Sequence, residues 1–357
     1  MAGVKVPIFK LRIGGIDFSD SQLKKAVHKI DVERVSNGVS SFKVELVDND
    51  RLLADANSIT EGASCEIALG FAETGTAKVI EGIVTSVKTE HAKNSYLKLV
   101  VSGEDYLHRL TRGRKRNSWE TIKDSDLATE IVGKAGLSMD TEDCGLINPY
   151  VSQNNITNLA FLMERGKRIG YHVRAEDQTV IFKKPNRHAD PSHRLSSNVA
   201  KSDSCLIMEN CDIMPNSSNS VKKVVVRSYD PKSAEAIIAS ADQVDAMGGF
   251  ADAGTAAAKN NPDTTLQISC ENVYSTEEAQ LLAQAKLDLM ADEFVDAKVK
   301  IEGNGNVRVA TVVALEDVGT EYDGDYYVQK VTHTFTIASV NRGYGYWTTL
   351  ELSRTSH

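Results

Sequence analysis

The chain contains 357 residues, 41% of them hydrophobic and 25% charged, which is the composition of an ordinary globular protein. No apolar run of about 18 residues or more occurs, so no membrane-spanning helix is predicted, and the N-terminus lacks the apolar core of a secretory signal. The net charge of −8 is uneven, because residues 201–357 carry a net charge of −10 and residues 1–200 a net charge of +2. An acidic chain disfavours nucleic acid as a partner.

The cysteines are scattered along the chain, and no C-x-x-C pair occurs. An odd number of cysteines without paired spacing predicts reduced, mostly buried thiols. The five are Cys65, Cys144, Cys205, Cys211 and Cys270.

Residues 1–113 are predicted to form an antiparallel β domain. The chain length itself predicts two or three domains. Apolar and polar side chains alternate in several short segments, for example at Phe42, Val44 and Leu46, and turn residues separate these segments. This two-residue period is typical of strands with one buried face.

Residues 114–200 are predicted to form a small α+β module that ends in a polar linker. Its first helix is expected to begin with a cap at Asp124 or Ser125 and to end at Gly136. A second helix and a β-hairpin follow.

The second helix of the module has clear start and stop signals. Thr157 is the expected N-cap, and Gly170 is placed to supply a left-handed C-terminal cap. Leu159, Leu162 and Met163 share one face, which is the apolar stripe of an amphipathic helix. The following hairpin is expected to turn within the segment "AEDQ".

Residues 201–357 are predicted to form a second β domain. An Ala/Gly-rich insertion at about residues 231–264 is open to two interpretations, a loose helix or a mobile loop, and its low-complexity composition favours the loop. A helix is then expected to begin at a capping box of Ser275 and Glu278. Its buried stripe is expected to contain Leu282, Ala285 and Leu289 and to pack on the last β domain.

A weak internal repeat relates the two ends of the chain. In both, a Val-x-x-Val strand leads through a polar loop into an alternating strand that ends the domain. Chance similarity between two β-hairpins is the alternative explanation. The matched residues are Val84 with Val328, Val87 with Val331, Leu99 with Leu350, and Val101 with Leu352.

Three segments resemble a known family. They are "NNITNLAFLMERGKRIGYHVRAEDQTVIF", "VKKVVVRSYDPKSAE", and "STEEAQLLAQAKLDLM" followed by "DAKVKIEGN". In this order they are similar to the phage late control protein D group. That group includes the baseplate hubs of contractile phages and bacteriocins, and the N-terminal part of the VgrG spike proteins of type VI secretion.

The resemblance implies an α+β, mainly antiparallel β fold, with two tail-tube-like β-barrel domains flanking the small α+β module. It also implies a homotrimer whose pseudo-hexameric ring joins a six-fold inner tube to a three-fold spike. The expected partners are a separate spike protein, inner tube or tube-initiator proteins, and other baseplate proteins. The spike is expected on another chain because no spike segment follows the second β domain.

The expected location is a phage virion tail baseplate or a contractile injection particle assembled in the bacterial cytoplasm. Phage, bacteriocin and other injection systems all remain open at this point.

A basic run, "HRLTRGRKR", lies where the first domain meets the module. It is open to three interpretations: a solvated linker, a contact with a neighbouring subunit, or a nucleic-acid patch. Nucleic acid is the weakest of these, since no aromatic residues are interleaved with the charges. Arg112, Arg114, Lys115 and Arg116 are therefore the candidate subunit-interface residues.

No catalytic, cofactor or metal site is predicted. His188, Asp190 and His193 could ligate a metal, but they lie in a polar loop with no rigid element to orient them. His333 falls within a strand pattern and is interpreted as a packed or channel-facing residue. The sequence has no G-x-S-x-G and no H-E-x-x-H motif. A structural role is therefore expected, with a hub-associated cell-wall hydrolase as the alternative.

Overall fold

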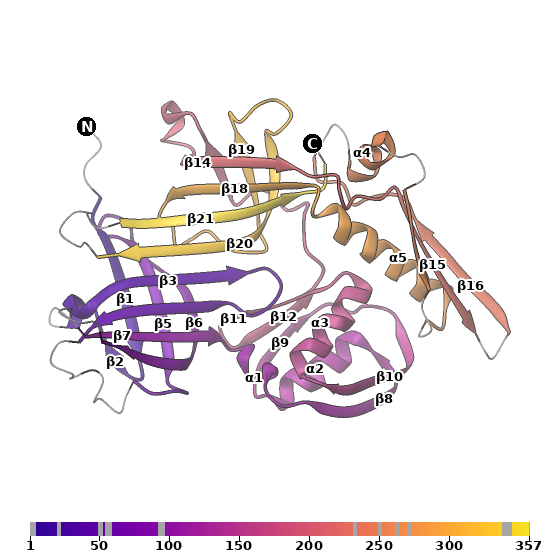
Figure 1. The fold of residues 1–357 in the computed structure, drawn as a ribbon, viewed down its shortest axis with the longest axis horizontal. Helices are drawn as coiled ribbons and strands as arrows, with labels where there is room; N and C mark the ends of the chain where they lie inside the picture. Colours follow the sequence, from indigo (N-terminus) through magenta and orange to yellow (C-terminus); the bar gives the residue numbers. More distant parts are fainter. Residues whose placement is uncertain are drawn as a thin grey trace.

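The fold is a large β body with a helical module and a small projecting sheet attached to it (Figure 1). The computed structural model describes residues 5–19, 23–48, 53, 59–91, 97–230, 234–248, 252–260, 264–269, 273–337 and 345–356. Cys270 lies outside these residues, and the other four cysteines are free thiols.

The secondary structure changes along the chain from strands, to mixed elements, and back to strands. The first part contains β1 (Pro7–Ile13), β2 (Ile16–Asp17), the 3-10 turn η1 (Leu23–Ala26), β3 (Val27–Val35), β4 (Ser41–Val47), β5 (Ser64–Phe71), β6 (Gly75–Glu90) and β7 (Lys98–Asp105). The middle contains α1 (His108–Thr111), β8 (Lys115–Lys123), α2 (Asp124–Lys134), β9 (Ser138–Thr141), β10 (Ile147–Ile156), α3 (Asn158–Ile169), β11 (His172–Glu176) and β12 (Thr179–Lys183). The last part contains β13 (His193–Ser196), η2 (Val199–Lys201), β14 (Leu206–Pro215), β15 (Lys223–Asp230), β16 (Glu235–Ala241), α4 (Ala253–Asn260), β17 (Thr265–Ser269), α5 (Thr276–Ala291), β18 (Val295–Glu302), β19 (Val312–Glu316), β20 (Gly324–Thr336) and β21 (Gly345–Arg354).

Both ends of the chain join in one sheet of 13 strands, in the order β19-β13-β14-β18-β21-β20-β3-β4-β7-β6-β5-β1-β2. In the second half, β19 also pairs with β20, so six strands close on themselves. The first half has no such closing pair among its described strands. The mainly antiparallel α+β class is therefore confirmed. In the second half, six strands form a closed ring of hydrogen-bonded neighbours.

The strand order shows that the two halves repeat one pattern. In the first half the order is β3-β4-β7-β6-β5-β1, and in the second it is β14-β18-β21-β20-β19-β13. Each list has its strands in the same relative chain order. The two orders differ in the direction of their last pair of strands. In the first half β1 lies antiparallel to β5, whereas in the second half β13 lies parallel to β19.

Irregularities in the ladders recur at equivalent places. One register shift lies between Val84 and Ser86 of β6, and another lies between Val328 and Lys330 of β20. The two register shifts lie 244 residues apart, which is also the spacing between Val84 and Val328 in the sequence match. A β-bulge is a specific local feature, so its recurrence supports duplication more strongly than alternation does.

The sequence match of the last strands, which pairs Leu99 with Leu350 and Val101 with Leu352, is wrong by two residues. In the first half Val87 lies opposite Val101, and in the second Val331 lies opposite Leu350. Val101 therefore corresponds to Leu350. Period-two alternation permits this slip, because a shift of two residues keeps every side chain on the same face.

The module between the halves has its own buried core. The predicted cap at Asp124 or Ser125 is wrong, because α2 begins at Asp124 and no side chain caps it. The Asp124 carboxylate instead accepts two hydrogen bonds from Arg165, at 2.6 and 2.9 Å. Arg165 compensates this fully buried carboxylate, which would be strongly destabilising without its partner.

The second helix of the module starts and stops as predicted. Thr157 Oγ1 accepts a hydrogen bond from the Ala160 amide at 3.2 Å. Gly170 ends α3 in the left-handed conformation, with φ 73°. The hairpin β11–β12 turns at Asp177 and Gln178, within the predicted segment.

A separate layer is inserted between β14 and β18, where the first half has only the short connection from β3 to β4. It contains the sheet β16-β15-β17 and the helices α4 and α5. The loop interpretation of residues 231–264 is wrong in part, because β16 and α4 lie there. Residues 231–233, 249–251 and 261–263 of that stretch lie outside the described residues.

The capping box of α5 forms with a shifted partner. Ser275 Oγ accepts a hydrogen bond from the Glu278 amide at 3.1 Å, as predicted. Glu278 Oε2 accepts from the amide of Tyr274, one residue before the cap, at 2.9 Å. Its other oxygen accepts from Arg168 of the module at 2.6 Å.

The predicted buried stripe of α5 is wrong at one end. Within residues 201–357 the helix packs on the inserted strands β15 and β16, and it also contacts α3 of the module. It buries Ala279, Ala283 and Leu287 together with the predicted Ala285, while Leu289 is 38% exposed. Two alanines one turn apart let the helix lie close to the sheet, which places Leu287 in its core.

We expect Leu287→Ala to lower the free energy of unfolding by about 2–5 kcal/mol, because a fully buried leucine is lost and a cavity remains. Leu289→Ala is the matched control and should cost about 1 kcal/mol at most, since that side chain is partly in water. Chemical denaturation of both variants measures the difference. Equal losses would show that α5 does not pack on this sheet through Leu287.

Candidate functional site

The two halves are joined by the pairing of β20 with β3, which runs from Lys330 opposite Val35 to Thr336 opposite Lys29. On the exposed face, Lys330 Nζ lies 3.0 Å from Glu33 and 3.8 Å from Glu351. One lysine thus bridges β21, β20 and β3. Cross-strand ion pairs of this kind favour one register over its alternatives.

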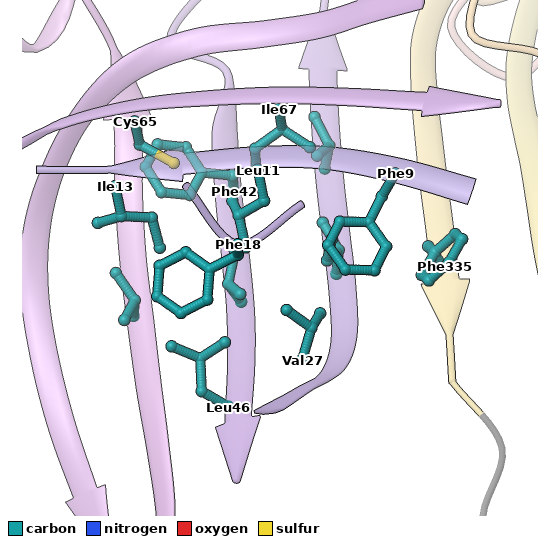
Figure 2. Packing of buried hydrophobic residues seen from close by; sticks show 14 of the residues in the cluster. Phe9, Leu11, Ile13, Phe18, Val27, Phe42, Leu46, Cys65, Ile67 and Phe335 are labelled. Carbon is teal, nitrogen blue, oxygen red and sulfur yellow. The ribbon is translucent and has the colours of Figure 1, made fainter. Parts of the chain in front are cut away.

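The buried face of this joint is shared by both halves. Phe335 of β20 and Tyr346 of β21 belong to the core of the first half. Phe9 of β1 points toward Phe335 (Figure 2), with ring centroids 5.3 Å apart in an edge-to-face arrangement. The halves therefore share one apolar core at the joint, which fixes their relative orientation.

His333 lies inside the joint and is 1% exposed. Its Nδ1 lies 3.1 Å from Thr348 Oγ1 and 3.0 Å from the Tyr346 hydroxyl. Burial lowers the pKa of His333 from 6.5 to about 3, and the nearby Arg308 and Arg34 add to the effect. The imidazole is therefore neutral and packed, in agreement with the packed interpretation.

Two arginines tie the joint to its surroundings through backbone carbonyls. Arg34 donates to the carbonyls of Val79 at 2.8 Å and Ala175 at 3.2 Å, so it links β3 to β6 and to the module. Arg308 donates to the Lys78 carbonyl at 2.8 Å and links the second half to β6. Guanidinium donors are always charged, so these ties persist across the physiological pH range.

The module meets the second half at a seam with a buried ion pair. Arg187 forms a two-point contact with Asp292, in which the Nε to Oδ1 distance is 2.9 Å. A small pocket between α3 and α5 borders this pair and is lined by His172, Lys167 and Lys184 among others. Removing one partner of such a pair is strongly destabilising, so the seam sets how the module sits.

The basic run is exposed, and its members take different roles. Arg112, Arg114, Lys115 and Arg116 are exposed, and Lys115 and Arg116 begin β8 rather than lying in a linker. No ion pair joins these four to any acidic residue of the described chain. Arg109 belongs instead to the module, because its guanidinium lies 5.0 Å from the Tyr106 ring centre.

The structure does not gather the candidate metal ligands. His188 Nε2 lies 2.6 Å from Asp245 Oδ1, and His193 Nδ1 lies 3.2 Å from Ser192 Oγ. Asp190 is exposed. Within the described ranges, no group of three histidine, cysteine or acidic side chains could hold a metal ion.

Sequence reasoning missed the ion pairs that position the parts. Asp124 with Arg165 and Arg187 with Asp292 are separated by 41 and 105 residues. The available signal was weak: Asp124 stands at the start of an apolar helical stripe, where a buried carboxylate needs a cation. The identity of that cation could come only from the fold.

Solved structures with the same fold are tail and secretion proteins. One is the 43 kDa tail protein of prophage MuSo2 from Shewanella oneidensis, with a TM-score of 0.73, 14% identity and 98% of each chain covered. A tail protein from Neisseria meningitidis MC58 has a TM-score of 0.70 and 15% identity, covering 98% of this chain and 96% of its own. An E. coli component of the type VI secretion system has a TM-score of 0.58 and 12% identity, covering 98% of this chain and 77% of its own.

The fold is therefore that of phage tail proteins and of a type VI secretion component. A family model described as the Alg8 N-terminal domain matches residues 5–336, and the chain belongs to that family. No curated protein matches the chain. Among the described residues, no helix has the length and apolar character needed to cross a membrane.

The lowered pKa of His333 predicts a loss of stability in acid. As the pH falls below about 6.5, the unfolded chain binds a proton that the folded chain does not bind until about pH 3. His333→Asn should therefore reduce the slope of unfolding free energy against pH by up to about 1.4 kcal/mol per pH unit between those values. Denaturant titrations at several pH values measure this slope, with His91→Asn at an exposed position as control. Parallel curves for the parent and His333→Asn would contradict the assignment.

Proposed function

We propose that this protein is the structural baseplate hub of a contractile tail or injection particle. Three copies would form a ring that joins a six-fold inner tube to a three-fold spike. The observation that carries the proposal is the repeated strand order within one chain, with its equivalent bulges in β6 and β20. Two similar units in each of three subunits present six similar units to a six-fold partner.

The joint between the halves supports this role. A symmetry adapter needs a constant angle between its two units, because an error in that angle prevents ring closure. The shared core of Phe9 and Phe335 and the continuous pairing of β20 with β3 fix that angle. The similar folds of tail proteins from Shewanella oneidensis and Neisseria meningitidis also favour a tail component.

The proposed partners are a separate spike protein, inner tube or tube-initiator proteins, and other baseplate proteins. We propose a homotrimer in a phage virion tail baseplate or another contractile injection particle, assembled in the bacterial cytoplasm. The tail-tube-like identity of the two units belongs to the same proposal. It is supported by the closed ring of β13, β14, β18, β19, β20 and β21 in the second half.

A non-enzymatic role is part of the proposal, in preference to a cell-wall hydrolase. Two buried titratable groups have structural partners: Asp292 pairs with Arg187, and His333 contacts two hydroxyl groups. The pKa of buried His172 is lowered to about 3, mainly by burial, so it is also neutral. The contacts of Asp292 and His333 hold the fold together, which supports a structural role for these buried groups rather than a part in hydrolysis.

We expect the purified chain, alone or co-expressed with its spike, to form a ring-shaped homotrimer. Light scattering after size exclusion gives the mass, and negative-stain images give the shape. A monomer or dimer that persists in the presence of the spike would overturn the hub proposal.

We expect the basic run to act in contacts between subunits. Replacing Arg112, Arg114, Lys115 and Arg116 by serine should lower the trimer fraction and leave the thermal unfolding of the subunit unchanged. The parent trimer should also weaken as salt is added, since exposed charges are screened. Its acidic second half supplies the opposite charge.

The control for this test carries the same charge change elsewhere. Arg114→Ser with Arg116→Ser is compared with Lys24→Ser and Lys25→Ser, because both lysines are exposed within η1. Equal effects of the two double variants would show that only net charge matters. Unchanged assembly of the quadruple variant would remove the run from the interface.

A further inference from the structure

The inserted sheet β16-β15-β17 is present once in the chain, although the β units are present twice. The first half connects β3 to β4 directly, at the place where the second half carries this layer. In Figure 1, β15 and β16 project away from the body beyond α5. A trimer would therefore display three such sheets on its surface.

The free edge of this sheet follows from its hydrogen bonds. The amide of Lys223 donates to the Thr264 carbonyl, so odd-numbered residues of β15 direct their backbone groups toward β17. Even-numbered residues, such as Val224 and Val226, then pair with β16. Their partners are Ala241 and Ala239.

The alternate residues of β16 therefore direct their N–H and C=O groups away from β15. These residues are Ala236, Ile238 and Ser240. The Ser240 carbonyl accepts a hydrogen bond from Gln280 Nε2 at 3.1 Å, which agrees with its outward direction. Within the described part of the chain, the outward backbone groups of Ala236 and Ile238 have no hydrogen-bond partner.

This edge lacks the usual features that prevent strand addition. Natural edge strands are commonly short, bulged, or interrupted by lysine or proline. The β16 segment "EAIIASA" has neither residue, and its register with β15 is unbroken from Glu235 to Ala241. Helix α5 covers the face that carries Ile237 and Ala239 but leaves the opposite face open.

Two large apolar side chains are exposed on the open face beside this edge. Ile238 is 55% exposed, and Tyr229 of β15 is 57% exposed, while the exposed Arg227 lies directly opposite Ile238. Tyr229 lies opposite Ala236, so Tyr229 and Ile238 are diagonal neighbours on one face. An added strand with an apolar side chain next to Ile238 would cover Ile238.

We propose that β16 receives an extended segment from another protein of the assembled particle as an added β-strand. Backbone hydrogen bonds to Ala236 and Ile238 supply the affinity, and Ile238 selects an apolar side chain in the segment. This inference rests on the proposed hub function. It adds the chemistry of one partner contact, which is an extended polypeptide with an apolar side chain beside Ile238.

The test compares amide hydrogen exchange of residues 235–241 in the free chain and in intact particles isolated from the producing cell. In the particle, exchange of this segment should slow by about tenfold or more, because outward amides become hydrogen-bonded. If the chain is absent from the particles, the proposed hub function itself fails. If it is present and this segment is not protected, only the strand-addition proposal fails.

Two variants separate strand addition from simple side-chain cover. Ile238→Pro removes the outward N–H, and its missing donor leaves the ladder with β15 intact. Ile238→Thr keeps that N–H and removes the apolar contact. In particles, Ile238→Thr should keep most of the protection and Ile238→Pro should lose it.

Exchange of the Val224–Val226 amides reports whether the sheet is intact in each variant. If Ile238→Pro disturbs those amides, the comparison of the parent with Ile238→Thr still tests strand addition, because Ile238→Thr keeps the outward N–H and loses the apolar contact. Protection that is equal in Ile238→Pro and Ile238→Thr, with the sheet intact in both, would overturn strand addition.

Discussion

The pairing of β20 with β3 is the interaction on which the rest of the structure depends. It converts two β units at opposite ends of the chain into one sheet, and its buried side contributes Phe335 to the core of the first unit. Because a register slip of one residue would turn every side chain to the wrong face, the alternation itself enforces the alignment. Lys330, which contacts both Glu33 and Glu351, reinforces it at the surface.

The other parts are held against this sheet by charged side chains whose partners are distant in sequence. Arg34 fastens the module to β3, and Arg187 with Asp292 fastens the stretch after the module to the end of α5. Buried ion pairs contribute little net stability compared with apolar packing, but they tolerate few alternative geometries. Charged contacts thus help to attach the module, whereas the two halves share an apolar core at their joint.

Local features were predictable from sequence because their causes are local. The caps of α3 depend on Thr157 and Gly170 alone, and strand alternation shows which face is buried. The joint was not predictable, since pairing Val35 with Lys330 requires knowledge of contacts across nearly the whole chain. The stripe of α5 was misassigned because alanine suits buried and exposed positions alike, so Ala279 and Ala283 gave no clear signal. The exposure of the basic run could be expected from its charges, whereas its lack of acidic partners within the described chain required the structure.

The short connection between β3 and β4 carries a consequence for how the duplicated units diverged. Asn37 Oδ1 in this turn accepts a hydrogen bond from the Val173 amide, and the Gly38 amide donates one to the Val173 carbonyl. The turn therefore holds the module through two hydrogen bonds. The equivalent connection in the second unit has expanded into an extra layer, and its helix α5 also contacts the module, where Glu278 accepts a hydrogen bond from Arg168. The two units thus hold the module in different ways, one through a short turn and the other through an added helix. The strands β15 and β16 add new surface beyond that helix without replacing either attachment (Figure 1).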